Sequence, residues 1–179
     1  MMLLVIKRKS EDKLRIIELG IELRRATMNI QVLEKEEIKV VGISRSGTYA
    51  QMSKIPDLFD ELKERLGEVP NQTNDSVLIA PFHSRETEFT CYIATPVEKV
   101  ENVPDGMVGF TIPRKNYVCS SHKGSLEELE NTYREMLVWM EEYGYDLDGN
   151  ALSLEVLKDN DNSTNFELYL PIKSYKITY

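Results

Sequence analysis

The sequence predicts an α+β fold in which two β-α-β-β units follow each other and are related by pseudo-twofold symmetry. We expect a mainly antiparallel sheet with the helices on one face and a central groove. Two observations predict this fold. A helical stripe of apolar residues flanked by strand-like alternation occurs twice, and the two occurrences keep one spacing of 77 residues along the chain.

Several positions that are 77 residues apart carry the same or a similar residue. Glycines at expected turns are among them, where a positive φ or a close approach of the backbone is often needed. The matching pairs are Ser44 and Ser121, Gly47 and Gly124, Gly67 and Gly144, Phe89 and Phe166, and Tyr92 and Tyr169. The chain therefore contains an internal duplication with only two copies, which indicates pseudo-twofold symmetry and not a solenoid.

The first half of the duplication covers residues 28–97. Extended segments at 30–32 and 38–41 are separated by a charged turn, and we expect a loop at 44–49. A helix follows, with Ser53 as the expected N-cap, Pro56 in its first turn and Gly67 at its end. Two strands at 77–80 and 88–94 complete this half.

The second half covers residues 107–173 and repeats the order of the first. A strand leads into the turn at Gly124, and the motif Ser125–Glu128 predicts a capping box at the start of the second helix. Gly144 ends that helix. Strands at 152–156 and 166–172 follow it and complete the predicted sheet.

Residues 1–27 lie outside the repeat and form an N-terminal extension. A helix through Leu14, Ile17 and Ile21 is one interpretation, although Gly20 weakens it. A translation start at Met28 is the other interpretation, and it would make this extension an upstream artefact. The remainder, residues 28–179, is predicted to be one domain.

Composition limits the classes of partner. The net charge of −8 argues against direct nucleic-acid binding and against anionic membranes, and favours cationic ligands or a basic protein surface. No segment is long and apolar enough for a membrane span or a signal peptide, so we expect a cytoplasmic protein. The spacing of Cys91, Cys119, His83 and His122 does not resemble a zinc site. No metal or cofactor is expected.

The last strand contains an acid among large apolar residues. In an extended segment, Phe166, Leu168 and Leu170 share one face, and Glu167 and Tyr169 share the other. The first face has the character of a core. For Glu167 two interpretations stay open: a carboxylate that pairs with a ligand cation, or a surface acid paired with a lysine.

Several motifs resemble the gyrase-inhibitor-like (GyrI-like) effector-binding domain. They include the segment Val103–Met107, the His122-Lys123-Gly124 turn and the closing segment Glu167–Lys173. The resemblance extends from about Met28 to Lys173 and implies a pseudo-symmetric fold with a central groove for small, often cationic and aromatic molecules. Such domains occur behind DNA-binding modules of bacterial MerR-type or AraC-type regulators, and also alone.

The resemblance also implies ligand-binding residues. Glu167 matches the acidic groove residue of drug-binding members, and Tyr49 stands where the family often has Gly-Pro-Tyr, with Thr48 here in place of the proline. Candidates of lower rank are the aromatic residues Tyr92, Tyr117, Trp139 and Tyr169. For the tyrosines the alternative is ordinary strand packing, and for Trp139 it is the core, because it matches Leu62 in the repeat.

The resulting functional hypothesis is a standalone effector-binding protein that takes small hydrophobic, cationic molecules for sequestration or for sensing linked to transcription. No catalytic residue is assigned, and a binder is favoured over an enzyme. Two alternatives stay open. One is a hydrolase of a strained electrophile that uses a groove Glu and Tyr, and the other is an inhibitor that binds a DNA-handling enzyme such as gyrase. A regulator or such an enzyme would then be its protein partner.

Overall fold

The computed structural model describes residues 29–74, 76–124, 126–158 and 165–173. The expected extension 1–27 and the N-cap Ser125 lie outside these residues, so the proposed domain boundary stays a prediction. The elements, in chain order, are β1 (Gln31–Lys35), β2 (Ile38–Thr48), η1 (Tyr49–Lys54), α3 (Ile55–Arg65), η2 (Leu66–Glu68), β3 (Val77–Ser84), β4 (Glu88–Pro96), β5 (Val108–Ile112), β6 (Lys115–Lys123), α4 (Leu126–Glu142), β7 (Ser153–Lys158) and β8 (Asn165–Pro171).

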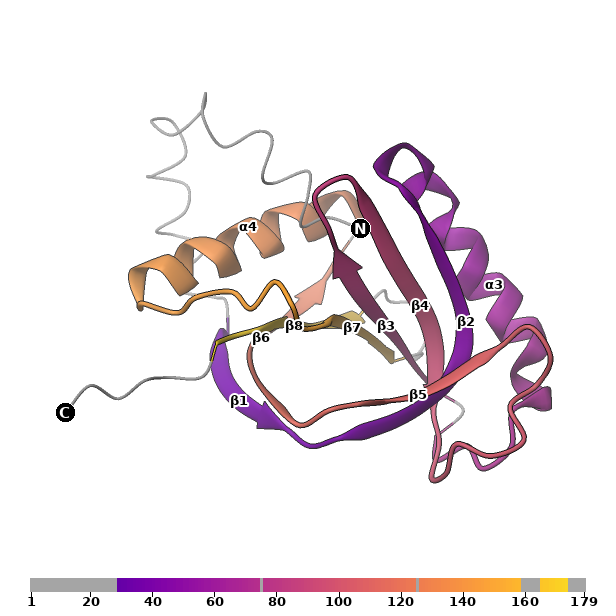
Figure 1. The fold of residues 1–179 in the computed structure, drawn as a ribbon. Coiled ribbons are helices and arrows are strands. Elements are labelled where there is room, and N and C mark those ends of the chain that lie inside the picture. Colours follow the sequence, from indigo (N-terminus) through magenta and orange to yellow (C-terminus); the bar gives the residue numbers. More distant parts are fainter. Residues whose placement is uncertain (1–28, 75, 125, 159–164, 174–179) are drawn as a thin grey trace.

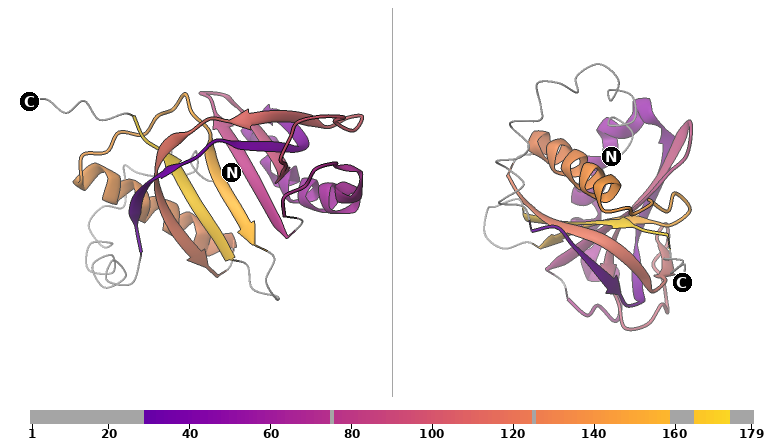
Figure 2. Two further views of the ribbon diagram at one scale, coloured as in Figure 1. Left: turned by 90° about the horizontal axis from the view of Figure 1, so that it is seen from below. Right: turned by 90° about the vertical axis from the view of Figure 1, so that its left-hand side faces the viewer.

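The described strands form one eight-stranded sheet in the order β1-β6-β8-β7-β3-β4-β2-β5. Every pairing is antiparallel. The sheet curls into a half-barrel with α3 and α4 on its outside, and β1 and β5 lie at the two edges (Figure 1). Figure 2 shows the same curl from two other sides. The predicted fold class, with helices on one face of an antiparallel sheet, is confirmed.

The duplication is visible in the element boundaries. β2 and β6 begin at Ile38 and Lys115, and β4 and β8 begin at Glu88 and Asn165. At the centre of the sheet Ile79 of β3 pairs with Val156 of β7, and these two residues are equivalent in the repeat. The pseudo-twofold axis therefore passes through this pair, between the two halves.

The first strand of each half crosses to the other half. β1 precedes β2 in the chain but pairs with β6, whereas β5 precedes β6 but pairs with β2. The register is equivalent in the two cases, with Gln31 opposite Cys119 and Val108 opposite Gly42. Sequence reasoning missed β5, and it therefore missed this exchange of strands.

Two local expectations were wrong. The segment 44–49 is not a loop, because β2 continues to Thr48 and pairs with β4 from Val40 to Thr48. Its small polar residues gave no apolar signal, but the hydroxyls of Ser46 and Thr90 bond across the strands at 2.9 Å. Ser53 is not an N-cap, since η1 runs directly into α3 and Lys54 holds that position.

Three buried clusters form the core. Two lie beneath the helices: α3 contributes Leu58 and Leu62 to one, and α4 contributes Met136 and Met140 to the other. The third cluster contains strand residues of both halves and no helix residue. It lies on the inside of the curl, and we call this side of the sheet the inner face.

Candidate functional site

The inner face is buried although no described helix packs on it. Val40, Ala94 and Leu154 are all 0% exposed there, and Tyr117 is 2% exposed. An uncovered flat sheet would leave such side chains in water. Their burial follows from the curl, which brings side chains of distant strands against each other. An apolar concave surface of this kind, with few polar groups, is typical of small-molecule sites.

A shift of register aligns two tyrosines across the inner face. Tyr169 of β8 lies opposite Leu154 of β7, which lies opposite Pro81 of β3. The register of β3 and β4 places Pro81 beside Tyr92, which lies opposite Ser44. Three strand spacings of about 4.8 Å separate the two tyrosine backbones, roughly 14 Å in a flat sheet. The curl turns both rings toward the same space.

The register of β2 and β4 also departs from the repeat. In the second half Tyr169 lies opposite Cys119, so strict symmetry would put Tyr92 opposite Gly42. Instead Ala94 lies opposite Gly42, and a side chain on Gly42 would place its Cβ 2.0 Å from the carbonyl oxygen of Ile93. Glycine therefore permits the close approach of β2 and β4 that goes with this register.

The acid predicted from the last strand lies on the inner face and is partly buried. The Tyr169 hydroxyl donates to Oε2 of Glu167 at 2.7 Å. Phe166, Leu168 and Leu170 pack instead in the cluster beneath α4, as the alternation predicted. Burial raises the pKa of Tyr169, and the hydrogen bond to Glu167 raises it further. The phenol therefore stays protonated as a hydrogen-bond donor.

A lysine meets the same tyrosine from the exchanged strand. Nζ of Lys35 on β1 lies 4.3 Å from the centre of the Tyr169 ring, within the range of a cation–π interaction. Lys35 is half-buried at the end of its strand. Glu167 therefore has elements of both interpretations, since it lies on the inner face and its hydrogen-bond partner Tyr169 also carries a lysine of the chain over its ring.

Tyr117 and Cys119 form the floor beside this group. The Tyr117 ring meets Tyr169 edge-on, with centroids 5.9 Å apart, and burial raises the pKa of Tyr117 to about 12. The thiol of Cys119 is also buried, and burial raises its pKa. The negative charge of Glu167 raises this pKa further, whereas the positive charge of Lys35 lowers it.

The first half presents an apolar counterpart. The Tyr92 ring lies 4.7 Å from the ring of Phe110 on β5. Ile112 is the repeat equivalent of Lys35 and is 1% exposed. The two sides of the inner face therefore differ in character: one is aromatic and uncharged, and the other holds a carboxylate, a phenol and an ammonium.

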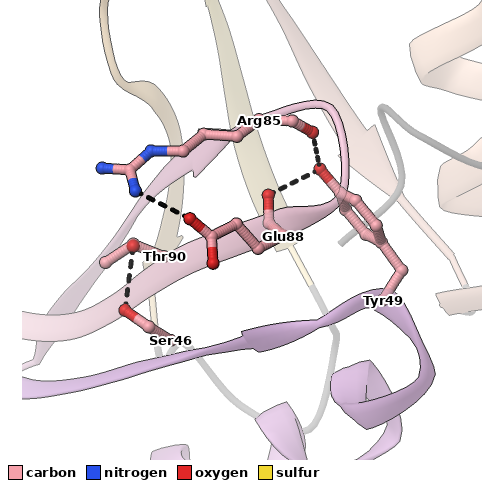
Figure 3. A network of polar contacts seen from close by, with 5 residues as sticks. All are labelled: Ser46, Tyr49, Arg85, Glu88 and Thr90. Atoms are coloured by element: carbon pink, nitrogen blue, oxygen red, sulfur yellow. Dashed lines mark hydrogen bonds and ion pairs between the residues drawn. The ribbon is translucent and has the colours of Figure 1, made fainter.

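Tyr49 lies apart from this group. It packs against the cluster beneath α3, and its hydroxyl donates to the carbonyl oxygens of Arg85 and Glu88, the latter at 2.9 Å (Figure 3). The hydroxyl also bonds to that of Ser84 at 3.0 Å. Through these hydrogen bonds, Tyr49 holds the β3–β4 hairpin against the end of β2.

Trp139 also lies away from the inner face. It packs at the edge of the cluster beneath α4, stacked against Tyr143 and Tyr145 with ring centroids 4.4 Å and 5.5 Å away. This position agrees with its match to Leu62 in the repeat. A ligand on the inner face would not touch it.

Among the inner-face residues beside the tyrosines, sequence reasoning did not predict Lys35, Phe110 and Cys119 as site residues. Lys35 and Phe110 reach the face only because β1 and β5 change halves. The residue type alone gave no signal for Lys35, which was expected to lie in the charged turn between the first two strands. The repeat could have located β5, because residues 108–112 match β1 at the constant spacing.

Two classes of site find no support in the part of the chain that the structure describes. No cluster there of three or more His, Cys, Asp or Glu side chains could hold a metal ion. None of the helices in the same residues has the length and apolar character that crossing a bilayer needs.

This chain matches one protein family model, and its fold matches several solved structures. The family model for integron-associated effector-binding proteins (Cass2) matches residues 31–172. A structure of SAV2435 bound to tetraphenylphosphonium superposes with a TM-score of 0.67 at 14% identity, and covers 82% of this chain and 95% of that one. No curated protein sequence matches this chain.

Two further structures share the fold. The C-terminal domain of EcmrR, a protein also seen in a complex with DNA, has a TM-score of 0.63 at 18% identity, and the match covers 83% of this chain and 99% of that one. A hydrolase from Listeria innocua has a TM-score of 0.52 at 16% identity, covering 85% of this chain and 97% of that one.

Proposed function

Because the chain belongs to the family of integron-associated effector-binding proteins, with its gyrase-inhibitor-like fold, we propose that it binds small hydrophobic cations on its inner face. The aromatic rings of Tyr92, Tyr117 and Tyr169 would contact the apolar part of the ligand. Glu167 would compensate its charge. The bound protein would then act in sequestration or in sensing linked to transcription.

The hydrogen bond from Tyr169 to Glu167 carries this proposal. A carboxylate that lies partly buried beside aromatic rings loses much of its hydration, and a ligand cation restores favourable interactions. The phenol holds the carboxylate in place at 2.7 Å. The phosphonium-bound SAV2435 supports the choice of a cation, since its fold is the same.

Replacement of the carboxylate tests the electrostatic part. We expect Glu167→Gln to weaken binding of tetraphenylphosphonium by about 1–3 kcal/mol, the contribution of a charge-assisted contact, and to leave a neutral analogue such as triphenylphosphine oxide nearly unaffected. Isothermal titration calorimetry measures the affinities for both ligands. Glu98→Gln is the matched control. Glu98 is exposed, so this substitution removes the same charge at a position away from the inner face. Equal losses for both ligands would contradict the role of Glu167.

A hydrolase is the second candidate, and one observation favours it. The Glu167 and Tyr169 side chains form a hydrogen-bonded pair of the kind that general-base catalysis on a small electrophile needs, and a protein with the same fold is a hydrolase. Incubation with epoxides of aromatic hydrocarbons and chromatography of the products would distinguish the two. A binder saturates, whereas an enzyme continues to release diol.

The cellular role follows from what the bound state contacts. The presence of the fold in EcmrR, which is seen bound to DNA, supports sensing linked to transcription. If the chain senses a cation for a partner, affinity capture should recover a regulator or a DNA-handling enzyme only with ligand present or only without it. Sequestration predicts the same captured proteins in both conditions.

A further inference from the structure

The ammonium group of Lys35 lies where a ligand cation would be expected to lie. Its Nζ is 4.3 Å from the centre of the Tyr169 ring, and the hydroxyl of that ring bonds to Glu167. Aromatic face and carboxylate are the two features that attract a cation to this side of the inner face. Lys35, a side chain of the chain itself, occupies the position over the aromatic face.

The strand exchange sets this position. β1 pairs with β6 so that Lys35 lies opposite Lys115, and like charges opposite each other repel. The two lysines turn to different partners. Nζ of Lys115 bonds to Oδ2 of Asp148 at 2.5 Å, and Lys35 extends over the Tyr169 ring.

The fold itself does not require a cation at this position. The equivalent residue in the first half is Ile112, which is buried at 1% exposure. There the equivalent tyrosine, Tyr92, meets the uncharged ring of Phe110. The same scaffold therefore accepts an apolar side chain at the position of Lys35, which makes the lysine a feature of this site and not of the architecture.

We propose that Lys35 is an internal competitor that sets the charge specificity of the inner face. This inference builds on the proposed binding function. A cationic ligand must displace the ammonium from Tyr169, whereas a neutral or anionic aromatic ligand can bind with Lys35 in place. Lys35 therefore lowers the affinity for cations and raises that for anions, and its flexible stem lets the ammonium return to water.

Two ions of nearly equal size test the proposal, tetraphenylphosphonium and tetraphenylborate. We expect Lys35→Met to bind the phosphonium about five- to tenfold more tightly, which is the loss of one cation–π competitor, and the borate more weakly. Lys39→Met is the matched control, because Lys39 is exposed on β2, the next strand along the chain, which does not pair with β1. It should change both affinities less than about twofold, as expected for a distant, screened charge.

Lys35→Ile copies the equivalent residue of the first half and serves as a second variant if Lys35→Met folds poorly. Unchanged or weaker phosphonium binding by a folded Lys35 variant would overturn the proposal. Phosphonium binding by the wild type that depends on Glu167 would then still support the proposed function. If neither the wild type nor a folded variant binds the phosphonium, the proposed function itself is contradicted.

An NMR measurement on the wild type is independent of any variant. The ring current of Tyr169 should shift the ε-methylene protons of Lys35 upfield in the NMR spectrum. Saturation with tetraphenylphosphonium should return them to ordinary lysine values, and tetraphenylborate should not. Signals that remain upfield while the phosphonium binds would show that Lys35 is not displaced and would overturn the proposal.

Discussion

The side chains of the inner face illustrate how burial changes acid–base chemistry at the scale of single residues. Burial raises the pKa of Tyr169, and Glu167 raises it further because a carboxylate accepts a hydrogen bond only from the protonated phenol. Burial alone raises the pKa of Tyr117, to about 12. Neutral phenols are thereby maintained beside a carboxylate, and they can donate to it or pack against an apolar ligand.

These shifts predict how stability falls at high pH. The folded phenols have pKa values above the ordinary 10.0, so their contribution is complete below pH 10 and is lost as the pH rises toward the folded values. We expect the free energy of unfolding to decrease above pH 10. Tyr169→Phe and Tyr117→Phe should each make that decrease smaller in urea titrations. Equal slopes for the variants and the wild type would contradict the shifts.

At low pH the ion pair of Lys115 and Asp148 has the opposite effect, because its contribution to stability is lost as the pH falls. The hydrogen bond from Lys115 lowers the pKa of Asp148 below its ordinary 3.8. Its contribution is therefore present above that value and is lost as the pH falls through the lower folded value. Asp148→Asn should reduce the loss of stability on acidification, measured by thermal unfolding between pH 5 and pH 2. If the unfolding temperature of the variant fell with pH as steeply as that of the wild type, the predicted role of Asp148 would be refuted.

At the scale of elements, the register between β2 and β4 departs from that of the equivalent strands β6 and β8. It depends on Gly42, where a Cβ would lie 2.5 Å from Cα of Ala94 in addition to its clash with the Ile93 carbonyl. The second half has Cys119 at the equivalent position and a different register. The glycine is therefore linked to the register between β2 and β4, the strand that carries Tyr92.

Gly42→Ala should consequently destabilise the protein by about 3 kcal/mol, since the backbone of β4 must move to admit the methyl group. It should also weaken ligand binding, because Tyr92 lies on β4 and would move with that strand. Gly67→Ala is the control, since a Cβ there meets no atom within 4 Å. Chemical denaturation measures the free energy of unfolding of both variants. A Gly42 variant as stable as the control would contradict the proposed role of the close approach.

Local pattern predicted much of the fold and part of the site. Alternation in the last strand identified the face of Glu167 and Tyr169, because strand geometry fixes which neighbours share a face. The repeat predicted the helices and central strands. It did not predict the exchange of β1 and β5, because pairing partners distant in sequence leave no periodic signal. Lys35 was missed for this reason, and Tyr49 was ranked as a groove residue although it holds a hairpin.

At the scale of the whole molecule, the exchanged strands join the two halves. β1 completes the sheet of the second half and β5 that of the first, and β3 and β7 pair at the pseudo-twofold axis. Neither half has its full sheet without the other. The inner face, which takes residues from both, should therefore be lost if either half unfolds.

This coupling predicts one cooperative unfolding transition. The chain carries a buried cysteine in each half, Cys91 and Cys119, and their thiols report the two halves separately. Reaction with a thiol reagent at increasing urea concentration, followed by peptide mass spectrometry, should give one midpoint for both. Separate midpoints would show that the halves unfold independently.

The most direct test of the central claim is a crystal structure of the protein with tetraphenylphosphonium. We predict the phosphonium on the inner face, between the rings of Tyr92 and Tyr169 and beside Glu167, with Lys35 turned away from the Tyr169 ring. A phosphonium bound on the helix side, or an inner face that stays empty at saturating concentrations, would contradict the account.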